Sequence, residues 1–133
     1  MNNDITYTGK EIAQYIINIT PNKDYITYSW IDKFVLPNKF ELKEIRVDTL
    51  LSDSYFLDYY MSYLENVEGS KRYHYSDSDG YYVDLDGNPV DISDDDLYLP
   101  IVIVDDMLID GFSRAANNLH DGEETIMAYV AIK

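Results

Sequence analysis

Residues 99–110, LPIVIVDDMLID, constrain the fold of this chain more than any other segment. The apolar run after Pro100 lacks the alternation of a half-exposed strand, so it predicts a strand buried on both faces. Two aspartates separate it from a second apolar run, which indicates the two arms of a tight hairpin. Gly111 then precedes a predicted helix over 112–122, and a run rich in Ile, Val and Tyr predicts a final strand over 124–133.

The first half of the chain alternates between helical and extended patterns. Apolar residues at helical spacing predict a helix over 9–20, and Ser29 is a candidate cap for a brief helix that must end before Pro37. Residues 40–51 alternate as a strand that leaves into a loop, and 52–69 predict a further helix. We therefore expect an α+β fold with a small mixed sheet and three or four helices.

The predicted helix over 52–69 carries two adjoining stripes of large side chains at four-residue spacing. These stripes are Tyr55, Tyr59 and Tyr63, and Phe56, Tyr60 and Leu64. A platform that stacks nucleic-acid bases needs basic residues between its rings, whereas acidic residues lie between these. The pattern therefore predicts rings that pack against the sheet.

A length of 133 residues and 46% hydrophobic content predict one folded domain. Within it we expect a helical N-terminal extension over 1–40 and a core over 41–133. Residues 73–99 interrupt this core with an insertion that is rich in aspartate and contains no lysine or arginine. Residues 81–92 of the insertion predict a hairpin with its turn at 86–88.

The charge of the chain restricts its partners. The formal net charge is -15, with only ten lysines and arginines, and such a chain repels a phosphate backbone. Direct nucleic-acid binding is therefore disfavoured. The same charge is consistent with simple solubility of an aromatic-rich protein or with imitation of DNA toward a basic protein partner.

The absence of cysteine excludes disulfides, thiolate metal sites and a cysteine nucleophile. The first twenty residues lack a basic segment followed by a long apolar core, and no stretch approaches the length of a membrane span. We therefore expect a cytoplasmic protein without a membrane partner.

The strand-to-helix junction at 110–114 is the candidate functional site. Gly111 allows a ligand to approach the main chain, and the first amides of the following helix lack intrahelical acceptors. Arg114 adds donors that match phosphate oxygens, so the junction indicates an anion site. The alternative is that Arg114 pairs with Asp110 or with an aspartate of the insertion, and that Gly111 only forms a turn.

The segment LPIVIVDDMLIDGFSRAANNLHDGEETIMAYVAI resembles the core of the ParB/sulfiredoxin superfamily. In that superfamily a strand that begins with proline leads through a turn to a Gly-x-x-Arg motif, a helix and a closing strand. This chain has Gly111, Phe112, Ser113 and Arg114 at the motif. Phe112 stands where sulfiredoxins have their reactive cysteine, which excludes their repair reaction. No helix-turn-helix region follows, so a chromosome-partitioning role for the chain alone is not expected.

The resemblance implies a nucleotide site in which Gly111, Phe112, Ser113 and Arg114 bind the cofactor, ATP or CTP with Mg²⁺. A divalent ion would bridge the nucleotide to the acidic chain, and Asp110 is the candidate metal ligand or base. Asp110 and Ser113 are then the candidate catalytic residues of a phosphohydrolase or phosphotransferase. Whether the catalytic activity of the family survives in this chain stays open at this point.

The alternative function is a non-catalytic acidic protein that binds a basic or DNA-binding protein, as a DNA mimic or a phage-type inhibitor does. The candidate partner-binding residues lie in the insertion and are Asp91, Asp94, Asp95 and Asp96. Charge attraction of this kind accelerates association and weakens with added salt. The two functions are compatible, because a fold that arose in an enzyme can be reused for binding.

Overall fold

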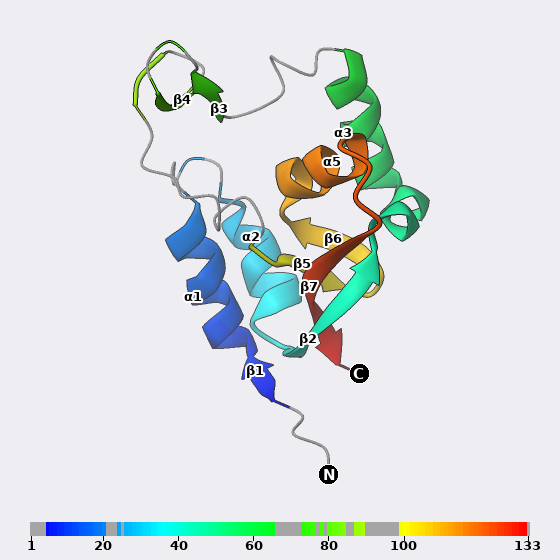
Figure 1. Cartoon of the computed structure of the whole chain (residues 1–133). Helices are drawn as coiled ribbons and strands as arrows, with labels where there is room; N and C mark the ends of the chain where they lie inside the picture. Colours follow the sequence, from blue (N-terminus) through cyan, green and yellow to red (C-terminus); the bar gives the residue numbers. More distant parts are fainter. Residues whose placement is uncertain are drawn as a thin grey trace.

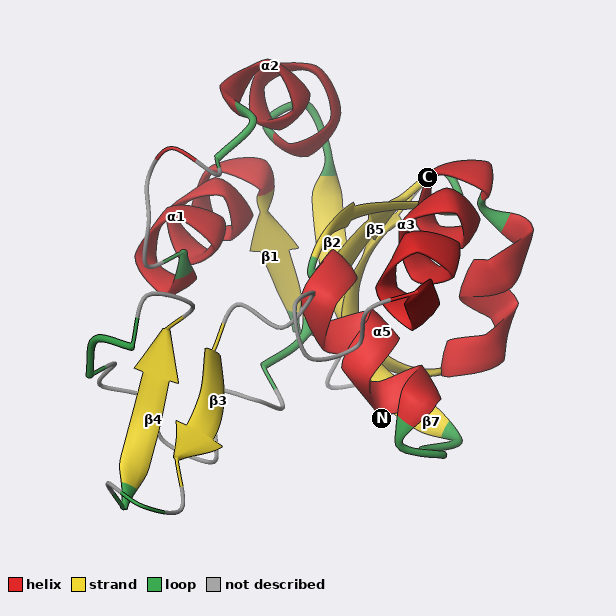
Figure 2. Cartoon of the chain, turned by 90° about the horizontal axis from the view of Figure 1, so that it is seen from above, coloured by secondary structure: helices red, strands yellow, loops and turns green. Residues whose placement is uncertain are grey.

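The computed structural model describes residues 5–20, 24, 26–65, 73–76, 78, 80–84, 87–89 and 99–132 of the 133-residue chain. A five-stranded mixed sheet forms the centre, with helices on both of its faces (Figure 1 and Figure 2). In chain order the elements are β1 (Thr6–Thr8), α1 (Gly9–Ile19), α2 (Tyr28–Trp30), the π-helical turn η2 (Ile31–Val35), β2 (Lys39–Arg46), the 3₁₀ segment η3 (Val47–Ser52), α3 (Ser54–Glu65), β3 (Tyr73–Ser76), β4 (Tyr81–Asp84), β5 (Ile101–Val104), β6 (Met107–Asp110), α5 (Phe112–His120) and β7 (Thr125–Ile132).

The strands of the main sheet lie in the order β1-β2-β7-β5-β6. β2 is antiparallel to both β1 and β7, β5 is antiparallel to β6, and β5 runs parallel to β7. The longest pairing joins Lys39 to Ile132 at one end and Arg46 to Thr125 at the other. β5 therefore has a strand on each side, as its uninterrupted apolar sequence predicts.

Two hydrophobic cores lie on opposite faces of the sheet, and β5 contributes to both. Successive side chains of a strand point to opposite faces, and all four residues of β5 are buried. Ile101 and Ile103 belong to the core with η3, α3 and α5, whereas Val102 and Val104 belong to the core with α1 and η2. Figure 2 shows these two groups of helices on either side of the sheet.

Local hydrogen bonds set the limits of the helices on the α1 face. Thr8 and Glu11 form a capping box at the start of α1, in which each side chain accepts from the main-chain amide of the other residue at 3.1 Å. The amide of Leu36 donates to the carbonyl of Ile31, five residues back, at 3.0 Å. This bond closes the π-turn η2, and the helix ends before Pro37, as predicted.

The α+β fold class with a small mixed sheet is confirmed. With α2 and η2 counted as one helix, the described residues contain five helical segments rather than the three or four expected. The expected strand over 40–51 ends at Arg46, and 47–52 form η3 instead of a loop. The segment expected as a helical extension over 1–40 supplies the edge strand β1 and one layer of helices on the sheet.

The rings of α3 pack only in part against the sheet. Phe56 and Tyr63 are buried and Tyr59 and Tyr60 are half-buried, in agreement with the prediction. Tyr55 is 60% exposed. The prediction that the rings of both stripes pack against the sheet is therefore wrong for this residue. Leu64 at the other end of the helix is also exposed.

The tight hairpin between β5 and β6 is confirmed. Val104 pairs with Met107, and the two residues between them, Asp105 and Asp106, have φ values of 51° and 64°. Such left-handed values are typical of the two-residue turns that match the twist of a hairpin. The two aspartates are therefore turn residues at an exposed tip.

The acidic insertion contains a hairpin that the sequence did not predict, in which β3 pairs with β4 and Tyr75 lies opposite Tyr82. An antiparallel bridge between Val83 and Pro89 is consistent with the predicted turn at 86–88. Residues 90–92, the rest of the second arm predicted for that hairpin, lie outside the described residues. Within the part of the chain that the structure describes, no helix combines the length and apolar character needed to cross a bilayer.

Candidate functional site

The junction between β6 and α5 carries the Gly-x-x-Arg motif. Gly111 is the N-cap of α5 and has φ 100° and ψ 26°, a left-handed conformation that disfavours side chains. A Cβ atom there would lie 2.5 Å from Cγ2 of Ile101 and 2.8 Å from Nη2 of Arg114. Both the backbone conformation and the close packing against β5 therefore require glycine. Among the described residues, no side chain caps this helix start.

Arg114 is held inside the fold at this junction. Its Nη2 atom donates to Oδ2 of Asp110 at 3.0 Å and to the carbonyl oxygen of Pro100 at 3.1 Å. The side chains of the ion pair are 15% and 23% exposed, so water screens it only weakly. The alternative interpretation, in which Arg114 pairs with Asp110, is the arrangement in the structure. Its Nε atom is buried and has no partner among the described residues.

Tyr15 of α1 completes this polar cluster, although the sequence pattern indicated only a core-facing helix position. Its hydroxyl donates to the same Pro100 carbonyl that accepts from Arg114. Burial raises the pKa of the Tyr15 phenol far above its usual value; Arg114 opposes this shift and Asp110 adds to it. The cluster therefore joins α1, the start of β5 and the β6–α5 junction.

The other predicted site residues lie at the same junction with different surroundings. The ring of Phe112 packs against Tyr59 and Phe56 of α3, with centroid distances of 5.4 and 6.3 Å, so its side chain belongs to the core. Ser113 is half-buried in the first turn of α5. Asp110, the candidate metal ligand and base, has its Oδ2 atom bound to Arg114.

The candidate partner-binding residues Asp91, Asp94, Asp95 and Asp96 lie outside the described residues. Among those that are described, no group of three or more His, Asp or Glu side chains is arranged to hold a metal ion. Asp110, the candidate metal ligand of the motif, already has a cationic partner in Arg114.

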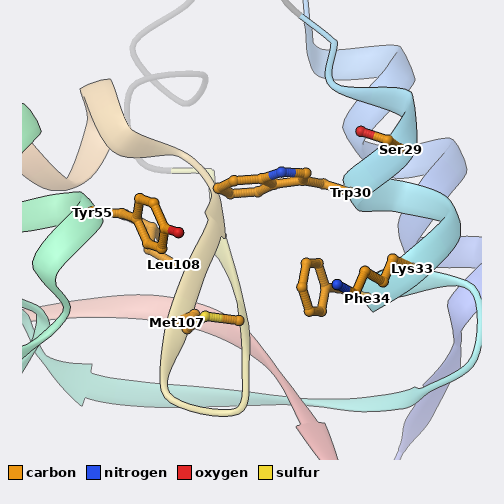
Figure 3. Close-up of a pocket in the computed structure, with 7 residues that line it drawn as sticks. All are labelled: Ser29, Trp30, Lys33, Phe34, Tyr55, Met107 and Leu108. Atoms are coloured by element: carbon orange, nitrogen blue, oxygen red, sulfur yellow. The ribbon is translucent and has the colours of Figure 1, made fainter.

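A second candidate site is a groove of about 320 Å³ between the α2–η2 segment and the start of α3. It is lined by Ser29, Trp30, Lys33, Phe34, Tyr55, Met107 and Leu108. The Trp30 ring extends across the groove toward β6, with Tyr55 on one side and Phe34 on the other (Figure 3). Both neighbouring rings meet Trp30 edge-on, with centroid distances of 6.0 and 6.2 Å. We name this site the Trp30 groove.

Sequence reasoning placed Trp30 and Phe34 on a brief helix but missed the groove. Its walls come from three segments, and only the i, i+4 spacing of the two rings on one helix is a local signal. Comparison with known proteins found no matching family model, no matching curated protein and no matching solved structure. The resemblance to the ParB/sulfiredoxin superfamily therefore stays a prediction.

Proposed function

We propose that this chain is a non-catalytic interaction protein that binds a basic protein partner, as a DNA mimic or a phage-type inhibitor does. The observation that carries the proposal is the Arg114–Asp110 pair, in which the cation of the Gly-x-x-Arg motif is neutralised inside the fold. The chain as a whole retains a formal net charge of -15. Its charge therefore favours a cationic partner over a phosphate ligand.

The Trp30 groove supports this proposal because its aromatic side chains can contribute binding free energy that charge alone does not provide. Rim charges mainly affect the rate of association, whereas buried aromatic anchors contribute most of the binding free energy of protein interfaces. Trp, Tyr, Phe and Met are enriched in such interfaces, and all four types line the groove. An acidic chain with an aromatic groove is thus suited to attract and then bind a basic protein.

The proposal is tested by capture of partners from an extract of the source cells on the immobilised protein. We expect basic proteins to be retained at low salt and released as salt is raised, because the attraction is screened. A variant with four Asp→Asn substitutions in the insertion should lose them. The substituted positions are Asp91, Asp94, Asp95 and Asp96.

A second variant with the same net charge is the matched control. It neutralises four exposed carboxylates elsewhere, as Glu→Gln or Asp→Asn: Glu44, Asp58, Glu65 and Glu123. Partners retained by this control and lost by the first variant would assign the interaction to the insertion. Capture of no basic protein by the wild-type chain, or equal retention by all three proteins, would contradict the proposal.

A second candidate function is nucleotide binding at the β6–α5 junction, with Mg²⁺ and a phosphohydrolase or phosphotransferase activity. It is favoured by the unsatisfied Nε atom of Arg114, by the left-handed Gly111 and by the uncapped start of α5 in the described structure. An anion bound there would accept a hydrogen bond from the Nε–H group of Arg114. The resemblance of residues 111–114 to the Gly-x-x-Arg motif supports the same function.

Thermal unfolding with ATP or CTP, with and without Mg²⁺, tests this second function. A ligand that binds only the folded state at about 100 times its Kd adds about 2.7 kcal/mol of stability. The gain should vanish in Arg114→Gln, and phosphate release measured on the same samples would report catalysis. Absence of any shift with millimolar nucleotide would exclude the nucleotide site.

A further inference from the structure

The Trp30 groove has the size and shape for one large side chain. Its volume of about 320 Å³ is at the lower end of ligand pockets, too small for a helix but sufficient for a long side chain. The rings of Phe34 and Tyr55 stand at 83° and 72° to Trp30, so ring faces and edges surround the space from several directions. Tyr55 is 60% exposed, which leaves that wall open to a guest.

The groove already holds a cation on an aromatic face. The Nζ atom of Lys33 lies over the Phe34 ring, 5.2 Å from its centroid. A ring face carries negative electrostatic potential and attracts an ammonium or guanidinium group within about 6 Å. Lys33 therefore occupies one cation-binding position of the groove, and the faces of Trp30 and Tyr55 offer further ones.

The charges around the groove favour a cationic guest. Asp106 lies at the exposed hairpin tip, next to the lining residue Met107, and Asp32 is exposed beside Lys33. The carboxylate of Asp53 lies directly behind the wall, because it accepts from the amides of Tyr55 at 3.0 Å and Leu108 at 2.8 Å. Among the described residues that line the groove, Lys33 is the one cation. The buried carboxylate of Asp53 and the net charge of -15 of the whole chain therefore both favour a cationic guest.

The backbone of β6 indicates that a side chain, rather than an added strand, enters the groove. The edge of β6 faces the groove, but the outward amide of Leu108 already donates to Asp53 and is not available to a new strand. The wall formed by Ile31–Val35 is a π-turn, a rare element that occurs frequently at functional sites. Main-chain pairing is therefore blocked at Leu108, and recognition depends on the ring faces.

We infer that the Trp30 groove receives the cationic side chain of an arginine or lysine from a basic segment of a protein partner. This inference rests on the proposed function and adds the chemistry of recognition. The guest stacks on one of the Trp30 and Tyr55 rings and contacts the other, and Lys33 moves aside. Arginine binds more tightly than lysine, because its planar guanidinium stacks on rings and is less strongly hydrated.

Trp30 is the only tryptophan of the chain, so its fluorescence reports on the groove directly. The test is a titration of the full chain with an acetylated and amidated tetra-arginine peptide. Tetra-lysine and tetra-glutamate peptides of the same length serve as comparison probes. We expect a saturable change in Trp30 fluorescence with tetra-arginine, a weaker affinity for tetra-lysine and no binding of tetra-glutamate.

Variants that leave all carboxylates unchanged distinguish binding in the groove from general electrostatic attraction of the peptide to the acidic chain. Tyr55→Ala removes one aromatic wall without a change of charge and should weaken tetra-arginine binding about fivefold. Lys33→Met removes the competing cation and should strengthen binding. Tyr28→Ala, at a 53% exposed tyrosine outside the lining, is the matched control and should bind as the wild type does.

The outcomes distinguish this inference from the proposed function. Tetra-arginine binding that is equal in the wild type, Tyr55→Ala and Lys33→Met would overturn the groove inference and leave the acidic interaction protein intact. No fluorescence change with tetra-arginine would likewise overturn the groove inference. Failure of the proposed function is read separately, from the capture experiment with the aspartate variants.

Discussion

Asp53 connects the start of α3 to the edge of the sheet, because its Oδ2 atom accepts a hydrogen bond from the amide of Leu108 at 2.8 Å. Its Oδ1 atom accepts from the amide of Tyr55 at 3.0 Å, as a helix N-cap does. One buried carboxylate thus satisfies a helix terminus and an outward amide of the edge strand β6. It blocks this position to strand addition and fixes Tyr55 beside the Trp30 groove.

Substitution of Asp53 should therefore destabilise the fold more than loss of a helix cap alone. Asp53→Ala leaves the amides of Tyr55 and Leu108 without their acceptor, which costs about 2–4 kcal/mol of unfolding free energy. Asp53→Asn keeps one oxygen and should cost less. Urea unfolding measures both, with Asp58→Ala on the exposed face of α3 as the control. Equal stabilities of Asp53→Ala and Asp58→Ala would show that neither hydrogen bond of Asp53 contributes to stability.

The Arg114–Asp110 pair should show a clear coupling energy in a double-mutant cycle. Arg114→Met leaves a half-buried carboxylate without its cation, and Asp110→Asn removes the charge from the acceptor of Arg114. We expect the two changes together to cost about 1–3 kcal/mol less than the sum of the single changes. Urea unfolding of the four proteins gives this value. Additive changes would mean that the contact is incidental, and the guanidinium would then be available to an anion.

A comparison of alanine substitutions at Gly111 and Gly122 separates two costs in stability, that of close packing at the motif and that of backbone strain. Both have positive φ, but an added Cβ at Gly122 meets no atom within 4 Å, whereas at Gly111 it meets Ile101 and Arg114. Gly122→Ala should cost about 1–2 kcal/mol from the left-handed backbone alone. Gly111→Ala should cost about 1–3 kcal/mol more, because β5 and Arg114 must shift. Equal costs would argue against tight packing at the motif.

The sequence predicted well those elements whose conformation is determined by residues close together in the chain. β5 was predicted because a short apolar run that ends at a turn is typical of a strand covered on both faces, and its tight turn followed from two adjacent aspartates. The pairing of Arg114 with Asp110 was foreseen as an alternative, since residues four apart around a helix start can meet. The fold class followed from the order of these elements.

The features that sequence missed depend on contacts between distant segments. Leu108 and Asp53 are 55 residues apart, and Tyr15 and Pro100 are 85 residues apart. β1 has three residues and no strand pattern of its own, because its extended form comes from pairing with β2. The Trp30 groove likewise exists only after α3 and β6 pack beside η2. No local periodicity encodes such contacts.

Stability should fall at alkaline pH because of Tyr15. Its pKa is raised in the folded state, mainly by burial, whereas the phenol of the unfolded chain titrates near pH 10. Above about pH 10 the unfolded chain therefore releases a proton that native Tyr15 retains, so the free energy of unfolding decreases as pH rises. Below that pH the contribution of Tyr15 is fully present.

Tyr15→Phe removes this titration together with the hydrogen bond to Pro100. At about pH 8 the variant should be less stable than the wild type by about 1 kcal/mol, which is the loss expected for one hydrogen bond. Toward about pH 11 the difference should shrink, because only the wild type carries the proton linkage of Tyr15. Urea unfolding across this range measures the difference, with Tyr28→Phe at an exposed site as the control. Parallel pH dependence in the wild type and Tyr15→Phe would mean that the buried phenol ionises as freely as in the unfolded chain, and the cluster around Pro100 would then be open to water.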